Sequence, residues 1–176
     1  MAQRLVVYRA CTSGALGALA MHLAATGAAG ESTVFRTNMN RTEWPPAKEL
    51  VLIECCGPDL DWLRTCCDHF SQVYVCDHGR STRDMLMQAA ALPANLHFRR
   101  ALGMLGSVMA VNIFGIQLTE AQRAFFARVQ DYVGGIHLYP QSHEFAENIV
   151  ARAIDYDVGT NPQLFTQLLE MAESTL

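Results

Sequence analysis

Three features that would assign a chain to a broad class are missing from this sequence. No apolar run approaches the roughly 20 residues of a membrane-spanning helix, so we expect no membrane association. The net charge is −4, which removes the general electrostatic argument for nucleic-acid binding. The N-terminus lacks the ordered charged, apolar and small-residue regions of a secretion signal. We therefore expect an intracellular, cytoplasmic protein.

Cysteines with the spacing of a zinc site are also missing. The six cysteines include two adjacent pairs, Cys55-Cys56 and Cys66-Cys67. Adjacent thiolates do not easily reach one tetrahedral ion, for which ligands usually follow a C-x₂₋₄-C spacing. Without a secretion signal, free thiols packed as small hydrophobic side chains are the expected state. A metal or redox site built from cysteines is the alternative.

Apolar strand-like segments alternate with amphipathic segments through the first hundred residues. The expected strands are Arg4–Tyr8, Thr33–Thr37, Leu50–Ile53, Gln72–Cys76 and Leu96–Phe98. The expected helices between them are Ala15–Ala25, a segment from Asp59 to about Phe70, and Ser81–Ala91. This alternation predicts an α/β fold with a doubly wound, mainly parallel five-stranded sheet.

The remainder of the chain contains helical patterns but no evident strand. The expected helices are Ala101–Phe114, a helix capped by Thr119 that runs to about Tyr132, Ser142–Ile154 and Pro162–Glu173. We therefore expect residues 1–100 to form the sheet with its helices. Residues 101–176 should form a helical region packed on that sheet, so that the whole chain makes one compact unit.

The most informative stretch is Val73–Ser81, in which an apolar strand runs directly into Asp77 and His78. Open α/β sheets bind ligands outside the carboxyl ends of their strands. Asp77 and His78 are therefore candidate functional residues. Glu54 ends an earlier apolar strand in the same way, so we expect all three side chains at one edge of the sheet.

A helix start directly after the first strand is a candidate phosphate site. It comprises Thr12, Ser13 and Gly14, with Thr12 or Ser13 as the N-cap. A helix N-terminus offers free amide donors and the positive end of the helix dipole, although an ordinary capped helix is the alternative. Arginines expected near the same edge could bind phosphate bidentately. They are Arg9, Arg80 and Arg83.

In pattern and order, the chain resembles the DHH family of phosphoesterases, in particular its oligoribonuclease-like and cyclic-nucleotide phosphodiesterase-like branch. The resemblance covers about Leu5 to Asp157. Val6–Gly14 stands in place of the first motif, a strand ending in histidine before a Cys-x-Asp-Gly turn and an alanine-rich helix. Leu50–Glu54 corresponds to the second motif, a strand ending in aspartate. Asp77–Gly79 corresponds to the Asp-His-His signature of the third.

Two later segments extend the resemblance. Gly106–Gly115 is similar to a small-residue helix that ends in Phe-Gly. Tyr132–Tyr139 stands where the family has a Tyr-Ile-x-Asp-x-Asp-Leu-Trp segment. Family members continue into a separate C-terminal substrate-binding domain, which we expect to be absent because the chain is too short to contain it in full.

The resemblance implies two divalent cations, usually manganese, about 3.5–4 Å apart and held by carboxylates and histidines. This chain departs from that ligand set at several positions. Tyr8 replaces the first-motif histidine, Ser13 its aspartate and Gly79 the second histidine of the third motif. Gly135 and His137 stand in place of the fourth-motif acids. Two bridged cations are therefore not expected, because these replacements supply no bridging carboxylate.

Glu54, Asp77 and His78 keep the character of metal ligands, and His137 could add a fourth. Together they could hold a single cation such as manganese. Each also has an ordinary structural interpretation. Asp77 could cap the following helix or turn, His78 could be a core histidine, and Glu54 could pair with an arginine such as Arg80 or Arg9.

Three functions are compatible with these residues. The favoured one is a DHH-like protein without catalytic metal or other cofactor, which acts as a binding or structural subunit with a protein partner or as a homo-oligomer. Methionines in the later helices would suit a partner surface, or would simply be core. The second is a divalent-metal-dependent phosphoesterase acting on small nucleotides or short oligonucleotides. The third is a metal-free binder of phosphate or nucleotide.

Overall fold

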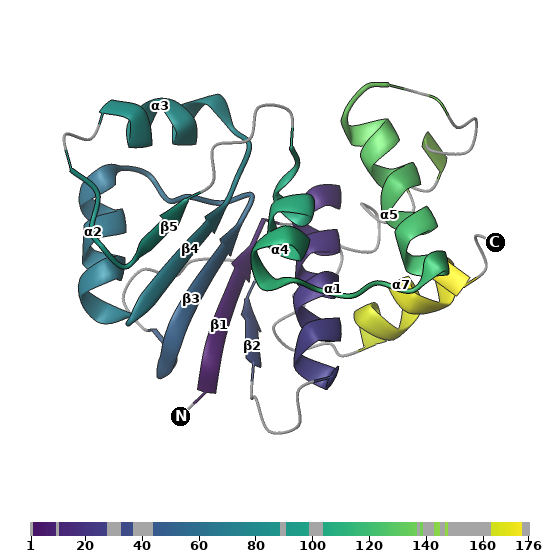
Figure 1. Ribbon diagram of the computed structural model, residues 1–176, viewed down its shortest axis with the longest axis horizontal. Helices are drawn as coiled ribbons and strands as arrows, with labels where there is room; N and C mark the ends of the chain where they lie inside the picture. The colour runs from purple at the N-terminus through teal and green to yellow at the C-terminus, as the bar shows by residue number, and fades with distance from the viewer. Residues whose placement is uncertain are drawn as a thin grey trace.

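All five strands of the described chain form one parallel sheet. A computed structural model describes residues 2–9, 11–27, 33–36, 44–88, 91–98, 104–136, 138, 143, 144, 147 and 163–173. The strands are β1 (Ala2–Tyr8), β2 (Thr33–Arg36), β3 (Ala47–Ile53), β4 (Gln72–Cys76) and β5 (Leu96–Phe98). Their order across the sheet is β2-β1-β3-β4-β5, and every neighbouring pair is parallel. The predicted doubly wound α/β fold is confirmed (Figure 1).

Strand register brings the carboxyl ends of the three central strands level. Tyr8 of β1 lies opposite Ile53 of β3, and Ile53 lies opposite Cys76 of β4. The residues that follow these three positions are therefore neighbours at one edge of the sheet. This edge includes the change of direction between β1 and β3, where sheets of this type bind ligands.

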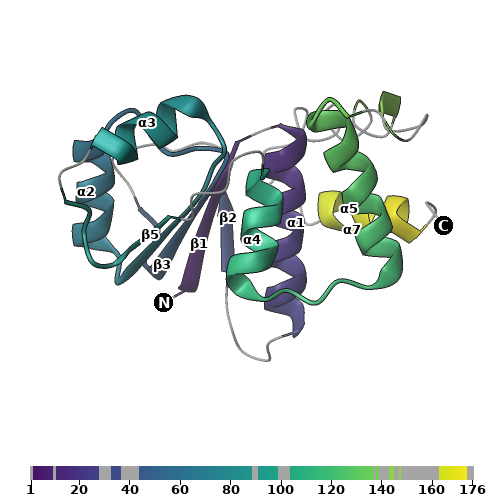
Figure 2. The same cartoon turned by 45° about the horizontal axis from the view of Figure 1, so that its top comes forward.

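Helices cover both faces of the sheet and add a further layer on one side. The helices are α1 (Thr12–Gly27), α2 (Leu60–His69), α3 (Arg80–Gln88), α4 (Gly106–Phe114), α5 (Glu120–Val133) and α7 (Gln163–Glu173). In Figure 2, α2 and α3 lie on one side of the sheet, and α4 and α1 lie on the other. Helices α5 and α7 pack on the outer side of α1. Among the helices described, none has the length and apolar character needed to cross a membrane.

Two hydrophobic cores correspond to the two faces of the sheet. Leu16 of α1, Val51 of β3 and Phe125 of α5 belong to the core on the α1 side. Leu50 of β3 and Leu63 of α2 belong to the core on the α2 side. Adjacent residues of β3 therefore face opposite cores, which explains why its apolar run is continuous rather than alternating.

Strand β4 is less covered than its apolar sequence indicates. Val73, Val75 and Cys76 are buried, but Tyr74 is only partly buried. On the α1 side of the sheet, Tyr74 stacks on His97 of β5 with ring centroids 4.7 Å apart. A long aromatic side chain can belong to an apolar run and still cover the exposed end of a sheet face.

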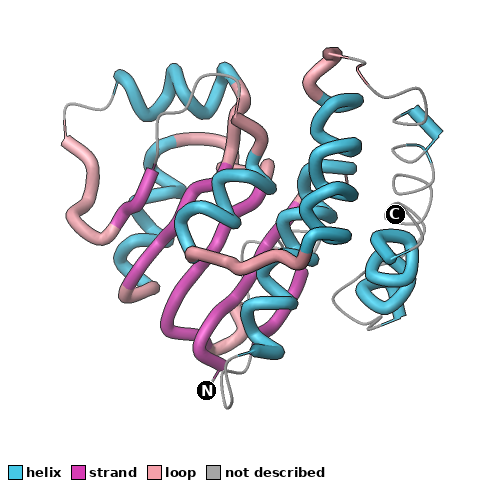
Figure 3. The backbone as a smooth tube through the Cα atoms, turned by 45° about the vertical axis from the view of Figure 1, so that its right-hand side comes forward, coloured by secondary structure: helices cyan, strands magenta, loops and turns pink. Residues whose placement is uncertain are grey.

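In the second half of the chain, the start of one helix agrees with the prediction and the start of another does not. The predicted cap of α5 is confirmed: the Thr119 hydroxyl accepts from the amide of Gln122, and the Gln122 side chain accepts from the amide of Thr119. Helix α4 begins at Gly106, later than the expected Ala101. Figure 3 traces the helices of this half as cyan tubes. The predicted helix 142–154 lies mostly outside the described residues.

Candidate functional site

Glu54 follows the end of β3 in an unusual backbone conformation. Its φ is 56°, in the left-handed region, and its amide donates to the carbonyl of Cys76 at 2.9 Å. A non-glycine residue held there stores strain of order 1–3 kcal/mol and persists only where its surroundings fix it. The residue is also buried, with 7% of its surface exposed. Both the backbone and the side chain of Glu54 are therefore constrained by their surroundings.

The carboxylate of Glu54 is bound by three parts of the chain. Its Oε1 accepts from the Ser13 hydroxyl at 2.5 Å and from the Gly106 amide at 2.7 Å. Its Oε2 lies 2.7 Å from Nδ1 of His78. One buried side chain thus joins the starts of α1 and α4 to the end of β4. The sequence interpretation in which Glu54 pairs with Arg80 or Arg9 is wrong.

Glu54 caps α4 from a distant part of the chain. The N-cap residue, Leu105, has no side-chain cap, and Gly106, the first helical residue, donates to Glu54 instead. The next amide, from Ser107, lies 3.4 Å from the Ser13 hydroxyl oxygen. A negative charge is stabilised at the positive end of a helix. The chain's own carboxylate therefore occupies the anion position at the start of α4.

Asp77 binds the turn that leads into α3. Its Oδ1 accepts from the amide of Gly79 at 2.8 Å, and its Oδ2 accepts from the Thr82 hydroxyl at 2.7 Å. Both oxygens thus have donors within the next five residues. The predicted capping role of Asp77 is observed, and Gly79 contributes to it by its amide.

Replacing Asp77 with alanine is expected to lower the free energy of unfolding by about 1 kcal/mol, because the bonds from the Gly79 amide and the Thr82 hydroxyl, which fix the turn into α3, are lost. Urea unfolding of the full chain measures the change. Asp59→Ala is a matched control, because Asp59 caps α2 through the amide of Trp62 at 2.8 Å. The two variants should lose similar stability. An unchanged unfolding midpoint for Asp77→Ala would contradict the capping role.

His78 is a surface histidine with one nitrogen fixed. Its side chain is 41% exposed, so the interpretation as a core histidine is wrong. A carboxylate only accepts hydrogen bonds, so Nδ1 carries the proton that faces Glu54. The other ring nitrogen, Nε2, has no hydrogen-bond partner among the described residues. The geometry is that of a carboxylate that orients an imidazole.

Glu54, Asp77 and His78 are brought together as the sequence predicts. One ligand atom from each lies within 4.8 Å of the others, and no other such group of His, Cys, Asp or Glu occurs in the described part of the chain. The cluster could hold one metal ion. His137, the fourth predicted ligand, lies outside the described residues. Tyr8, at the position of the first-motif histidine, is fully buried in the core beside α1.

The polar side chains of the predicted phosphate site at the start of α1 are buried in the protein. Thr12 and Ser13 are buried, and Ser13 donates to Glu54. The N-cap position belongs to Cys11, whose sulfur accepts from the amide of Gly14 at 3.4 Å. The expectation of Thr12 or Ser13 as the N-cap is therefore corrected, because the chain enters the helix one residue earlier.

The three candidate arginines differ in what they contact. Arg83 pairs with Asp84 at 3.2 Å. Arg9 and Arg80 are exposed, and neither guanidinium has a partner among the described residues. The amide of Arg9 donates to the carbonyl of Ile53 at 3.0 Å, which fixes its backbone beside β3. Two unpaired positive charges therefore lie near the ends of β1 and β4.

The six cysteines are free thiols, as the sequence predicts. Burial raises the pKa of Cys56, Cys66 and Cys76 to about 12, with nearby acids and thiols adding to the shift. Such thiols stay protonated and are poor nucleophiles at neutral pH. None of them joins the cluster formed by the acids and histidine in the described chain.

These thiols should make the protein sensitive to alkaline conditions. In the unfolded chain, a thiol ionises near its ordinary pKa of 9.0, whereas the folded chain keeps the proton of Cys56, Cys66 or Cys76 up to about pH 12. The native state therefore binds more protons in this window, and the free energy of unfolding falls as pH rises above 9. Urea unfolding in the presence of a reductant measures the decline; an unchanged midpoint between pH 8 and 10 would contradict it.

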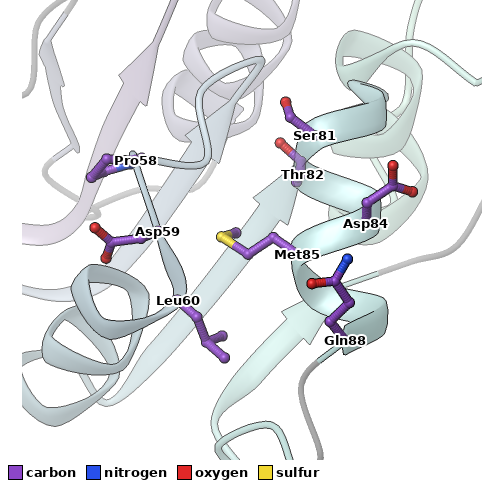
Figure 4. A pocket seen from close by; sticks show the side chains of 9 residues that line it. Pro58, Asp59, Leu60, Ser81, Thr82, Asp84, Met85 and Gln88 are labelled. Carbon is purple, nitrogen blue, oxygen red and sulfur yellow. The ribbon is translucent and has the colours of Figure 1, made fainter.

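A separate pocket of about 620 Å³ lies between the start of α2 and α3 (Figure 4). Met85 reaches across this space from α3, whereas the carboxylates of Asp59 and Asp84 point away from each other. Asp59 caps α2, and Asp84 pairs with Arg83. The pocket carries acidic rather than basic side chains, so it is poorly suited to an anionic ligand.

No protein-family model matches the chain, and the curated proteins include no sequence similar to it. The candidate site therefore rests on its own geometry. Three contributors were not predicted from the sequence: Cys11 as a cap, Gly106 as a donor and Ser107 as a neighbour of Ser13. Cysteine is a rare cap, and the two α4 residues are brought to Glu54 only by tertiary packing.

Proposed function

We propose that this chain is a DHH-like protein in which two-metal phosphoesterase chemistry has been lost and which acts as a binding or structural subunit. The order of strands and the positions of Glu54, Asp77 and His78 at strand ends support the resemblance. The substitutions at Tyr8 and Ser13 remove ligands that a dinuclear centre would need. In this proposal, the DHH-like fold serves to bind a partner instead of catalysing hydrolysis.

The observation that carries this proposal is the bonding of the Glu54 carboxylate. It accepts from Ser13 and Gly106 and contacts His78. A bridging metal ligand has to direct its oxygen lone pairs at the ions, whereas this carboxylate directs them at protein donors. Glu54 therefore has a structural role that does not depend on a metal. Ser13, which stands where the family has an aspartate, is one of those donors.

Hydrolysis of a chromogenic phosphodiester in the presence of manganese tests the loss of activity. We expect the wild-type chain to show no manganese-dependent turnover above that of His78→Gln. His97→Gln is the control for a general effect of removing an exposed histidine. Manganese-dependent turnover that is lost in His78→Gln and kept in His97→Gln would instead support a phosphoesterase with a single cation. Light scattering over a range of concentrations then separates a homo-oligomer from a chain that requires a different protein partner.

A further inference from the structure

Glu54 and His78 form a pair whose geometry suits a nucleophilic imidazole. Nδ1 of His78 lies 2.7 Å from a carboxylate oxygen that is itself buried. The imidazole is therefore held in the tautomer with its lone pair on Nε2. We propose that Nε2 of His78 accepts a phosphoryl group from a small donor with a labile bond to phosphorus, such as a phosphoramidate or an acyl phosphate. This activity goes beyond a binding role and requires no metal ion.

The carboxylate that orients His78 is unusually well fixed. Ser13 and Gly106 bind one oxygen of Glu54 and leave the other for the imidazole. The left-handed backbone of Glu54 adds a further restraint. Enzymes that use covalent catalysis orient the reacting side chain with a hydrogen-bonded partner that is itself held in place. Glu54 is such a partner for His78. Exposure of 41% leaves the outer part of the His78 ring accessible to a small reagent.

Positive charge near His78 favours an anionic donor. Arg80 is two residues further along the chain, and Arg9 directly follows β1, which is separated from β4 by β3. Both arginines are exposed, and neither guanidinium has a hydrogen bond or ion pair among the described side chains. Besides Glu54, Asp77 is the acidic side chain that lies close to His78. Its two oxygens already accept from Gly79 and Thr82, which reduces its repulsion of an incoming phosphoryl group.

The transfer step balances without an oxidant or a metal. The lone pair of Nε2 attacks phosphorus and forms an N–P bond. The bond from phosphorus to the nitrogen of phosphoramidate breaks, and ammonia leaves with the bonding electron pair and takes up a proton from water. Nδ1 keeps its proton, and the Glu54 carboxylate offsets the positive charge on the phosphorylated imidazole.

Two other histidines in the described chain, His97 and His143, have a different arrangement. Nε2 of His97 is bound to the Gln72 side chain. Nε2 of His143 lies 3.4 Å from the Glu147 carboxylate. In both, Nε2 is engaged, so attack would have to come from Nδ1, the ring nitrogen closer to the backbone, and greater exposure of His143 does not make it the better nucleophile. Phosphorylation should therefore occur at His78 and not at the histidine with the most exposed side chain.

The test is treatment of the full chain with phosphoramidate in the presence of a metal chelator, followed by peptide mapping under alkaline conditions that preserve phosphohistidine. We expect one phosphoryl group, on His78, added about tenfold faster than on His97 or His143, in line with the effect of an orienting partner on ligand or catalytic groups. His78→Gln should abolish the fast phase. Arg80→Gln should slow it severalfold, whereas Arg64→Gln, which removes an exposed arginine of α2 that pairs with Asp61, should leave it unchanged.

Glu54→Gln should slow the reaction at His78 about tenfold, and mapping the wild-type chain in urea provides the same comparison if that variant fails to fold. Loss of the preference for His78 in urea supports the proposal. The proposal is overturned if the phosphoryl group is found on Asp77, if it spreads over the histidines according to their exposure, or if His78 remains preferred in urea. Because a chelator is present and no hydrolysis is measured, these outcomes are independent of the manganese assay.

Discussion

Replacing Glu54 with alanine is expected to lower the free energy of unfolding by about 3–5 kcal/mol, the usual loss when one partner of a buried polar or ionic set is removed. The Gly106 amide and the Ser13 hydroxyl would remain buried without their acceptor. Helix α4 would also lose the acceptor of its first amide, from Gly106. Urea unfolding of the full chain measures this change.

Glu49, on the strand that leads to Glu54, provides a matched control. It pairs with Arg4 at 2.7 Å, and both side chains are partly exposed. Glu49→Ala should therefore cost about 1 kcal/mol, as surface ion pairs do. Glu54→Gln should lie between the two, because its amide oxygen can still accept from Gly106. A loss for Glu54→Ala no larger than that for Glu49→Ala would contradict the structural role of Glu54.

The second large effect is expected from Gly106→Ala, with a loss of about 3 kcal/mol from overpacking. A Cβ at this position would lie 2.2 Å from the carbonyl oxygen of Cys76 and 2.8 Å from Oε1 of Glu54. Neither neighbour can give way, because one is backbone at the end of β4 and the other is the anchored carboxylate. Helix α4 would have to move away from the sheet, and the bond from the residue 106 amide to Glu54 would lengthen.

Gly115, at the other end of α4, separates this clash from the general effect of adding a methyl group. It has a φ of 59°, and an added Cβ there would meet nothing within 4 Å. Gly115→Ala should therefore lose only about 1 kcal/mol, from backbone strain. Thermal unfolding of both variants measures the difference. Equal losses would contradict the close approach of α4 to the candidate site.

Both predictions concern contacts between segments that are far apart in the sequence, and this separation limits what the sequence could predict. The alternation of apolar and amphipathic segments specifies parallel strands, and parallel strands place Glu54 and Asp77 at one edge. The capping role of Asp77 could also be anticipated, because its donors lie within five residues. Local chemistry was sufficient in these cases.

The partners of Glu54 could not be identified in this way. Gly106 lies 52 residues further along the chain, and its amide reaches Glu54 only because α4 packs beside α1. No side chain marks a backbone donor in the sequence. The expected ion pair between Glu54 and an arginine failed for a different reason. The long side chains of Arg9 and Arg80 can reach many positions, so their place in the sequence did not specify which carboxylate they would contact. The sequence thus located the candidate site but not its bonding.

Equilibrium dialysis of the full chain against manganese, with Asp77→Ala in parallel, tests most directly whether the cluster is still a metal centre. If Glu54 serves the fold and the two-metal chemistry is lost, neither protein should retain manganese in a stoichiometric amount after the unbound ion is removed. Stoichiometric manganese held by the wild-type chain and lost in Asp77→Ala would contradict this account and establish Glu54, Asp77 and His78 as metal ligands.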